Sequence, residues 1–316
     1  MGKDGVKPML LVDCHHHLYD LSGTPDGYPE RRGPPRKTAF GTDELLRRDY
    51  TVDMYRADLA AMGATASVHI EAGRRPSDPV EETAWLSSLS HAGGPPTAIV
   101  AFADLSRPDA ETLLARHVAY ARVRGIRHIV TNSGGLAQLR PEDTLYARAD
   151  WLSAVPLLAK YGLSFEMQAP PTVASVAADV ARRNPDVTFV LLHCGHPVDR
   201  TPDGWQRWRA GLAALAACPN VVVKLSGFYM MNPKETIAGA RAIIDPIIDH
   251  FGPDRCMIAS NFPVDRLFVD GAGLRAMWDG ALANYTVSER TAIYGGTATR
   301  IYRMNDLFDL ARQREN

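Results

Sequence analysis

Short apolar segments alternate with longer amphipathic segments along the chain. Eight apolar runs have the length of strands, and several are almost continuously apolar, as expected for strands that are covered on both faces. These runs are Met9–Cys14, Ala66–Glu71, Thr97–Ala103, Gly125–Thr131, Leu163–Gln168, Val187–His193, Asn220–Ser226 and Arg255–Asn261. The segments between them have helical periodicity: Val52–Met62, Pro79–Ser90, Asp109–Arg122, Tyr146–Tyr161, Val173–Arg183, Asp203–Ala217, Lys234–His250 and Gly271–Ala283.

Eight strands that alternate with eight helices predict an α/β fold, a single (β/α)₈ TIM-type barrel domain over residues 1–316. A doubly wound open sheet is the structural alternative, but it usually has a glycine-rich loop after its first strand, where this chain has histidines. Two segments exceed the needs of a barrel. Tyr19–Tyr50 is a long loop after the first strand, either a lid over the catalytic mouth or a surface excursion. Ser288–Asn316 predicts C-terminal closing helices.

The composition narrows the class of partner. The formal net charge is −1 and 46% of the residues are apolar, so neither nucleic acid nor a membrane surface is expected as a partner. No apolar stretch of about 20 residues is present. The four cysteines are spread out and read as buried free thiols. We therefore expect a cytoplasmic protein that acts on a small molecule.

Histidines follow the first and sixth predicted strands. All strands of such a barrel end at one face, where catalytic residues gather. His15 and His17, two residues apart in extended chain, should point into the mouth together, with His16 pointing away. His193 ends the sixth strand at the same face. Three imidazoles in one mouth predict a catalytic cluster that can hold one divalent metal ion such as Zn²⁺, although a metal-free mechanism is equally open.

Other strand ends supply candidate substrate contacts. Arg127 and Lys224 are cations at the ends of the fourth and seventh strands, and each either anchors an anionic substrate or forms an ion pair inside the barrel. His69 and Glu71 share one face of the second strand, as Glu166 and Gln168 share one face of the fifth, and each pair faces either the barrel or the helices. From these we predict substrate contacts for His69 and Gln168 and a catalytic role for Glu166.

Six motifs occur in order along nearly the whole chain, and together they resemble the amidohydrolase superfamily. They are VDCHHHLYD at 12–20, GIRH at 125–128, LSFEMQ at 163–168, VLLHCGHP at 190–197, VKLSG at 223–227 and ASNFPVD at 259–265. The closer resemblance is to the amidohydrolase 2 branch, which includes sugar-acid lactonases, 2-pyrone-4,6-dicarboxylate lactonase and related decarboxylases. It implies that His15, His17 and His193 surround a metal or the polarised substrate carbonyl, that Arg127 binds substrate, and that a homodimer is an open option.

The eighth strand departs from that family pattern. The motif usually reads Gly-Ser-Asp-Trp-Pro, and its aspartate acts as general base or metal ligand, whereas this chain has Asn261 there. An amide cannot accept a proton at neutral pH. Either another carboxylate, Asp265, Glu166 or Glu71, takes the base role, or the chemistry differs from hydrolysis, or the residue was changed to trap a complex.

These observations predict a hydrolase that opens a lactone or a similar cyclic ester of a small anionic or hydroxylated substrate. Two alternatives remain open. One is a lyase or decarboxylase with the same fold, and the other is a catalytically silent ligand-binding homologue that has lost its base. The predicted catalytic residues are His15, His17, His193, Asn261, Asp265 and Glu166.

Overall fold

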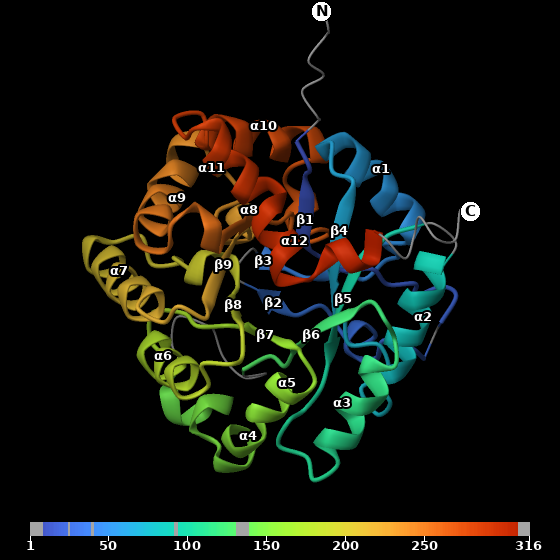
Figure 1. Cartoon of the computed structure of the whole chain (residues 1–316). Coiled ribbons are helices and arrows are strands. Elements are labelled where there is room, and N and C mark those ends of the chain that lie inside the picture. Colours follow the sequence, from blue (N-terminus) through green and yellow to red (C-terminus); the bar gives the residue numbers. More distant parts are fainter. Residues whose placement is uncertain (1–8, 25, 39–40, 92–93, 131–138, 309–316) are drawn as a thin grey trace, which may run out of the picture.

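Eight parallel strands form one sheet that curls into a barrel (Figure 1). The computed structural model describes residues 9–24, 26–38, 41–91, 94–130 and 139–308. The strands pair in chain order: β1 (Val12–His16), β4 (Ala66–Ile70), β5 (Ala98–Phe102), β6 (Val123–Arg127), β7 (Ser164–Met167), β8 (Phe189–Leu191), β9 (Val221–Leu225) and β10 (Cys256–Ile258). The first and last strands meet where His17 N–H donates to Phe262 O at 2.8 Å and Asn261 N–H donates to His15 O at 2.8 Å. The predicted TIM-type barrel is confirmed.

Helices surround the sheet on the outside (Figure 1). They are α1 (Val52–Met62), α2 (Val80–His91), α3 (Ala110–Val118), α4 (Ala149–Ala154), α5 (Pro156–Lys160), α6 (Ala174–Arg183), α7 (Pro202–Ala216), α9 (Ile237–Phe251) and α10 (Gly271–Ala281), with the short α8 (Phe228–Met231) after β9. None of the helices in the described part of the chain is long and apolar enough to cross a membrane. All four cysteines are buried and free, as expected.

Several boundaries differ from the predicted ones. β1 ends at His16 rather than Cys14, so the first histidines belong to the strand itself. β6 begins at Val123 and ends at Arg127, and the predicted end at Thr131 lies outside the described residues. The helix predicted over Tyr146–Tyr161 is divided into α4 and α5 at Pro156, because proline has no N–H to continue the helical hydrogen bonds.

The C-terminal segment closes one end of the barrel. After α11 (Val287–Thr291) a π-helical turn over Ala292–Gly296 leads into α12 (Thr297–Ile301). Tyr302 and Met304 then pack among the inward-facing side chains of the strands, such as Val68 and Val222. Arg124, near the start of β6, donates to Tyr302 O at 2.9 Å. The tail therefore plugs the N-terminal end of the barrel and leaves the opposite end for the strand-end side chains.

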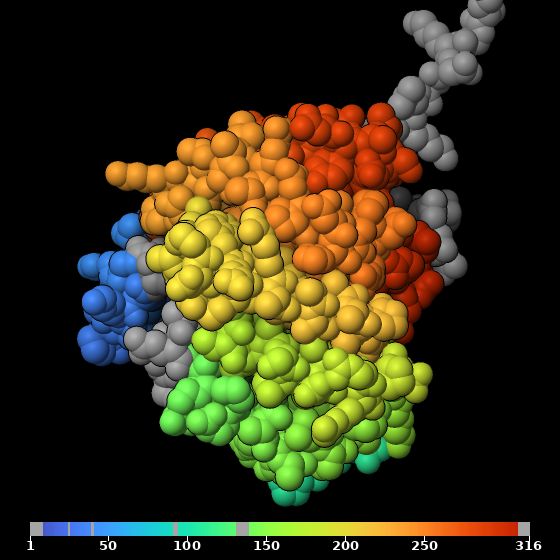
Figure 2. Space-filling view, turned by 90° about the vertical axis from the view of Figure 1, so that its left-hand side faces the viewer, coloured from blue at the N-terminus to red at the C-terminus, as the bar shows by residue number. Residues whose placement is uncertain are grey.

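The long loop after β1 lies at that opposite end. In Figure 2 it forms the blue region, on the other side of the molecule from the red C-terminal helices. Tyr19 and Tyr50 exchange backbone hydrogen bonds of 3.1 and 3.0 Å across its base, and it contains the two-residue strands β2 (Lys37–Thr38) and β3 (Gly41–Thr42). Arg75 N–H, after β4, donates to Gly27 O at 2.6 Å. The first part of the loop is therefore attached to the neighbouring strand-end segment.

Candidate active site

A β-bulge in β1 aims two histidines into the barrel mouth. Asp13 pairs with Ser67 and His16 with His69, so three steps along β1 correspond to two along β4. Val12 and Cys14 pack inside the barrel, and an unbroken strand would turn His16 inward after them. The extra residue reverses this alternation, so that His15 and His17 face inward instead.

Asp13 holds the bulge in place from the outer side. Its carboxylate accepts hydrogen bonds from Ser260 N–H and Ser260 Oγ, each at 2.7 Å, and from Tyr55 Oη at 2.7 Å and His15 N–H at 3.2 Å. Burial raises the pKa of Asp13, and these hydrogen bonds act in the opposite direction. Because Ser260 belongs to the end of the eighth strand, Asp13 joins the two strands that close the barrel.

The three predicted histidines come together. His15 Nε2 lies 3.3 Å from His17 Nε2, and the rings of His15 and His193 have centroids 4.7 Å apart. His17 Nδ1 lies 2.8 Å from Ile70 O, which can only accept, so the Nδ1 atom carries the proton and Nε2 presents a lone pair. His193 Nδ1 is 2.9 Å from Ser226 Oγ. His17 and His193 retain 8% and 5% exposure, whereas His15 is fully buried.

The cluster is held uncharged. Burial lowers the pKa of His15, His17 and His193 well below the usual value, and neighbouring cationic groups, Arg127 among them, lower it further. A neutral imidazole presents one N–H donor and one lone pair, and the lowered pKa makes that lone pair a weaker base than that of a free imidazole.

Two other histidines of this region face outward. His16 Nε2 lies 3.1 Å from Ser67 Oγ, and its ring stacks on Tyr55 with centroids 3.7 Å apart, which confirms that it points away from the mouth. His69 Nε2 accepts the Leu18 N–H at 2.9 Å, and burial lowers its pKa to about 3. His69 is fully buried and its strand turns this side chain toward the helices, and the substrate contact predicted for it stays a prediction.

Arg127 lies at the mouth and is already paired. Its Nε donates to Glu71 Oε1 at 2.7 Å and its Nη2 to Glu71 O at 2.8 Å. The remaining nitrogen, Nη1, is left for a substrate oxygen, and the side chain keeps some exposure. Glu71 neutralises most of the charge, so Arg127 is better suited to a hydroxyl or carbonyl oxygen than to a carboxylate.

Glu166 and Lys224 form an ion pair inside the barrel. Lys224 Nζ donates to Glu166 Oε2 at 2.7 Å, Tyr302 Oη donates to Glu166 Oε1 at 2.6 Å, and none of the three side chains reaches solvent. Both carboxylate oxygens are thus occupied inside the barrel. The interior ion pair, which the sequence left open for Lys224, is the one present, and the plug residue Tyr302 seals it from below, while the base role of Glu166 and the anchoring role of Lys224 stay predictions.

Asp265 binds Asn261 rather than approaching the histidines. Its carboxylate accepts from Asn261 Nδ2 at 2.9 Å, Tyr229 N–H at 3.0 Å and Met230 N–H at 3.1 Å, and it is fully buried. Burial raises the pKa of Asp265 to about 7, against these hydrogen bonds. The carboxylate fixes the Asn261 amide with its nitrogen toward Asp265, so both oxygens of Asp265 accept hydrogen bonds from the protein, and its role as replacement base stays a prediction.

Gln168 connects two loops. Its Oε1 accepts Val130 N–H at 3.3 Å and its backbone oxygen accepts Tyr146 Oη at 2.7 Å. The side-chain oxygen thus positions the segment after β6, and the substrate contact predicted for Gln168 stays a prediction.

The donors fit a metal ion only in part. The separation of 3.3 Å between His15 Nε2 and His17 Nε2 is close to the distance of about 3.3–3.4 Å between two tetrahedral zinc ligands. His17 also has its outer nitrogen held by a carbonyl, as metal-binding histidines usually do, but His15 Nδ1 is buried without a partner. Across the described ranges, no group of three His, Cys, Asp or Glu side chains is placed to hold a metal ion. The predicted metal site at His15, His17 and His193 therefore stays a prediction.

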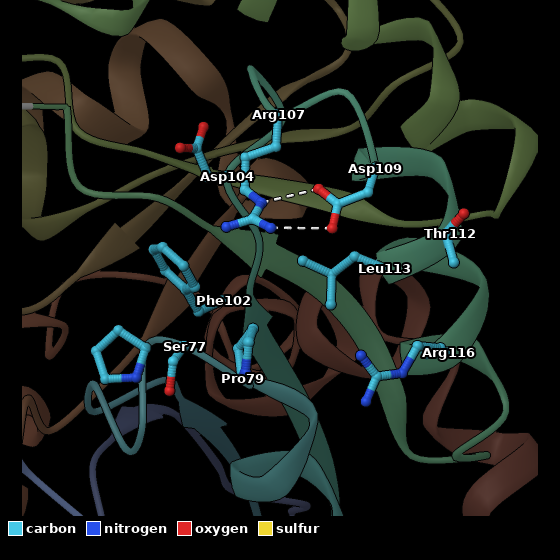
Figure 3. Close-up of a pocket in the computed structure, with 10 residues that line it drawn as sticks. Ser77, Pro79, Phe102, Asp104, Arg107, Asp109, Thr112, Leu113 and Arg116 are labelled. Carbon is cyan, nitrogen blue, oxygen red and sulfur yellow. Dashed lines mark hydrogen bonds and ion pairs between the residues drawn. The ribbon is translucent and has the colours of Figure 1, made fainter.

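A surface pocket lies one strand away from Arg127. Phe102, whose Cα pairs with that of Arg127 in the sheet, contributes to its wall, together with Ser77 and Pro79 from the segment after β4. Figure 3 shows Arg107 in this pocket with both of its bonded nitrogens turned to Asp109. Arg116 is likewise paired, with Asp78 at 2.9 Å. The cations of this pocket are thus satisfied by neighbouring acids.

Comparison with known proteins agrees with this architecture. The family model described as amidohydrolase matches residues 12–304. The chain belongs to the amidohydrolase family. This amidohydrolase is 33% identical over 321 residues to an L-fucono-1,5-lactonase of Burkholderia multivorans, with 95% of this chain and 98% of the relative covered. It is also 33% identical over 303 residues to an uncharacterized protein of Sinorhizobium fredii, with 95% and 100% covered.

A solved structure is similar over nearly the whole length of this amidohydrolase. The crystal structure of a zinc-bound amidohydrolase from Burkholderia multivorans superimposes with a TM-score of 0.76 at 26% identity, covering 93% of this chain and 99% of that one. The bound zinc is a feature of that solved structure.

Sequence reasoning missed several residues that shape the site. Asp13 lies two residues before the first histidine, and an acidic residue in an otherwise apolar strand was a signal of a buried partner. Ser226, which holds His193, follows Lys224 by two residues. Tyr302 comes from the tail, some 136 residues from its partner Glu166, and no local pattern points to it.

Proposed function

We propose that this amidohydrolase opens a lactone, hydrolysing the cyclic ester of a small oxygen-rich substrate. The observation that carries the proposal is the pair of neutral imidazoles, His15 and His17, whose Nε2 atoms lie 3.3 Å apart beside Arg127 in the mouth. The match to lactonases over nearly the entire chain supports the same substrate class.

The donor and acceptor atoms divide the work of ester hydrolysis. His17 Nε2 has the lone pair, so it takes a proton from the attacking water. With the proton of His15 on Nε2, that group and Arg127 Nη1 donate to the carbonyl oxygen, where negative charge develops. When the ring C–O bond breaks, the imidazolium of His17 returns its proton to the leaving ring oxygen. The product is the open-chain hydroxy acid.

Asn261 takes a supporting part in this scheme. Asn261 Nδ2 donates a hydrogen bond to Asp265, which leaves the side-chain oxygen of Asn261 to accept a hydrogen bond from water or from a substrate hydroxyl. It can hold such a group but cannot remove its proton. Hydrolysis therefore relies on the imidazole rather than on a strand 8 carboxylate.

His15 and His17 are also the residues that would hold a divalent ion such as Zn²⁺, with His193 as the further ligand. Such an ion supplies Lewis-acid polarisation of the carbonyl when bound. The assignments above to His17, Arg127 and Asn261 are made without it.

The test is the hydrolysis of a panel of aldonolactones and pyrone dicarboxylates. The reaction is monitored by the acid that it releases, and the metal content of each protein sample is determined. We expect turnover by the natural chain and its loss in His17→Ala, with an unchanged melting temperature. If no lactone in the panel is hydrolysed, the lactonase proposal is contradicted. Release of CO₂ from an aromatic acid would then favour the decarboxylase, and tight binding without turnover would favour the silent binding protein.

A further inference from the structure

The two cations predicted to anchor an anionic substrate are both neutralised by acids. Arg127 is paired with Glu71, and Lys224 with Glu166. A substrate carboxylate at either position would compete with a bonded glutamate. If the substrate is anionic, its carboxylate needs other donors near the mouth.

Such donors lie where the long loop meets the segment after β4. Tyr28 is 1% exposed, and its hydroxyl lies beside the Asp20 backbone N–H but has no acceptor for its own proton within the described chain. Arg31 Nε, and both Nε and Nη1 of Arg74, are likewise buried without a partner there. Each of these atoms is a donor, and leaving a buried donor unbonded is costly. Tyr28, Arg31 and Arg74 form what we call the Tyr28 cluster.

The members of the Tyr28 cluster act on one another. Burial and the nearby Glu82 raise the pKa of the Tyr28 hydroxyl, while Arg74, the Asp20 backbone N–H and Arg31 lower it, so both guanidinium groups lie within electrostatic reach of the phenol. The bond from Arg75 N–H to Gly27 O joins the two segments beside them. Arg31 also contributes to the lowered pKa of His17, so its guanidinium group lies within electrostatic reach of that histidine.

Stacking orients the two guanidinium groups. Arg31 Cζ lies 3.9 Å from the centroid of the Tyr19 ring, and Arg74 Cζ lies 4.9 Å from that of the Trp85 ring. A stacked guanidinium keeps its N–H edge for a planar acceptor such as a carboxylate. Arg31 has one weak protein bond, from Nη1 to Leu46 O at 3.3 Å.

Two guanidinium groups and the carboxyl group of Glu82 lie within electrostatic reach of Tyr28. Glu82 is the acid near Tyr28, and its Oε1 accepts Ala72 N–H at 2.8 Å. Burial raises its pKa to about 8, with Glu71 contributing, so the carboxyl is mainly uncharged at neutral pH. In contrast, Arg107 of the pocket in Figure 3 is paired with Asp109, and Arg116 of the same pocket is paired with Asp78.

We propose that Tyr28, Arg31 and Arg74 form a carboxylate subsite, which binds an acidic group on the part of the substrate remote from the lactone carbonyl. The inference rests on the proposed function and narrows its substrate to lactones that carry a carboxylate. A carboxylate offers acceptors for the phenol proton and both guanidinium groups at once.

The test compares two lactones with the same ring, D-glucaro-1,4-lactone with a carboxylate and D-glucono-1,4-lactone with a hydroxymethyl group in its place. We expect the natural chain to prefer the carboxylated lactone. Tyr28→Phe and Arg74→Gln should raise its KM by roughly 10-fold or more, leaving kcat and the neutral lactone nearly unchanged. Tyr50→Phe is the matched control, because the Tyr50 hydroxyl of the same loop already donates to Asp58 at 2.7 Å.

Melting temperature separates a binding role from a structural one. Tyr28→Phe removes a buried hydroxyl whose proton has no acceptor and should keep or raise the melting temperature, whereas Tyr50→Phe should lower it without changing the preference between lactones. If Tyr28→Phe lowers the melting temperature and spares KM, the hydroxyl is structural and the subsite is refuted.

A binding measurement keeps the subsite and the proposed function apart. Calorimetric titration with D-glucarate, an open-chain diacid, should show binding to the natural chain and weaker binding to Tyr28→Phe and Arg74→Gln. If that pattern holds without turnover of any lactone, the subsite stands and the lactonase proposal fails. If all variants bind D-glucarate equally, or the natural chain does not bind it, the subsite proposal is overturned even when neutral lactones are hydrolysed.

Discussion

Two layers of polar side chains lie inside this barrel, and they differ in how their bonding capacity is used. In the lower layer, Glu166 has one oxygen bonded to Lys224 and the other to Tyr302, and all three side chains are sealed from solvent. In the upper layer, His17 and Arg127 each have one side bonded to the protein and keep another nitrogen free beside partly exposed surface.

The difference teaches where chemistry can take place. A buried charge that is fully paired contributes to the integrity of the core and has no atom left for a substrate. A buried group that is held on one side and open on the other is positioned for binding or proton transfer. Residue type alone does not distinguish these cases, because two cationic residues at strand ends, Lys224 and Arg127, lie in different layers.

We expect the largest effect on stability from a substitution in the lower layer. Lys224→Met should leave Glu166 as a buried carboxylate without its cation and reduce the free energy of unfolding by about 3–5 kcal/mol. Urea denaturation measures this loss. The double variant Glu166→Gln with Lys224→Met should recover much of it, and a double variant as unstable as the single one would show that the pair is not the cause.

We expect the next largest effect, on activity, from a substitution in the upper layer. His17→Ala should lower kcat/KM by roughly 10²–10⁴-fold, because it removes the proton acceptor, and should change stability far less than Lys224→Met does. Steady-state kinetics on the best lactone of the panel checks this. His16→Asn is the control, since His16 faces Ser67 and Tyr55, and an equal loss of activity in both variants would argue against the assignment.

The pH dependence sharpens the comparison. Burial holds the pKa of His15, His16, His17 and His193 well below 6.5 in the folded chain, whereas the unfolded chain takes up protons near 6.5. The unfolded state therefore binds more protons below that pH, and stability should fall as the pH is lowered through it, by up to about 1.4 kcal/mol per pH unit for each histidine. His16→Asn should reduce the slope by one such contribution in calorimetric scans from pH 7 to 5, and an unchanged slope would contradict the neutral assignment of His16.

The smallest effect concerns Asn261. Asn261→Asp would place two carboxylates where the amide nitrogen now lies 2.9 Å from Asp265, so one of them should stay protonated. We expect a loss of about 1 kcal/mol at pH 8, from a pKa shift of about one unit, and no gain in activity. The exchange Asn261→Asp with Asp265→Asn should restore stability, measured by thermal melting. A large gain in kcat for the single variant would instead mark the asparagine as a lost base.

By itself, the sequence determined the barrel and the identity of the histidine cluster. Apolar runs of strand length and helical periodicity are local properties, and they predicted the eight strands because each run must be covered on both faces. The order of the motifs placed His15, His17 and His193 at one end, since parallel strands of a barrel share their direction.

Only the tertiary structure decided which polar groups were free. The alternation of β1 alone would have turned His16 inward, and the bulge held by Asp13 and Ser260 reversed it. Lys224 was paired with Glu166, which also bonds Tyr302, a residue arriving from the far end of the chain. The physical reason is that the bonding state of a buried polar group depends on partners that are distant in sequence, and only folding brings those partners within hydrogen-bond distance.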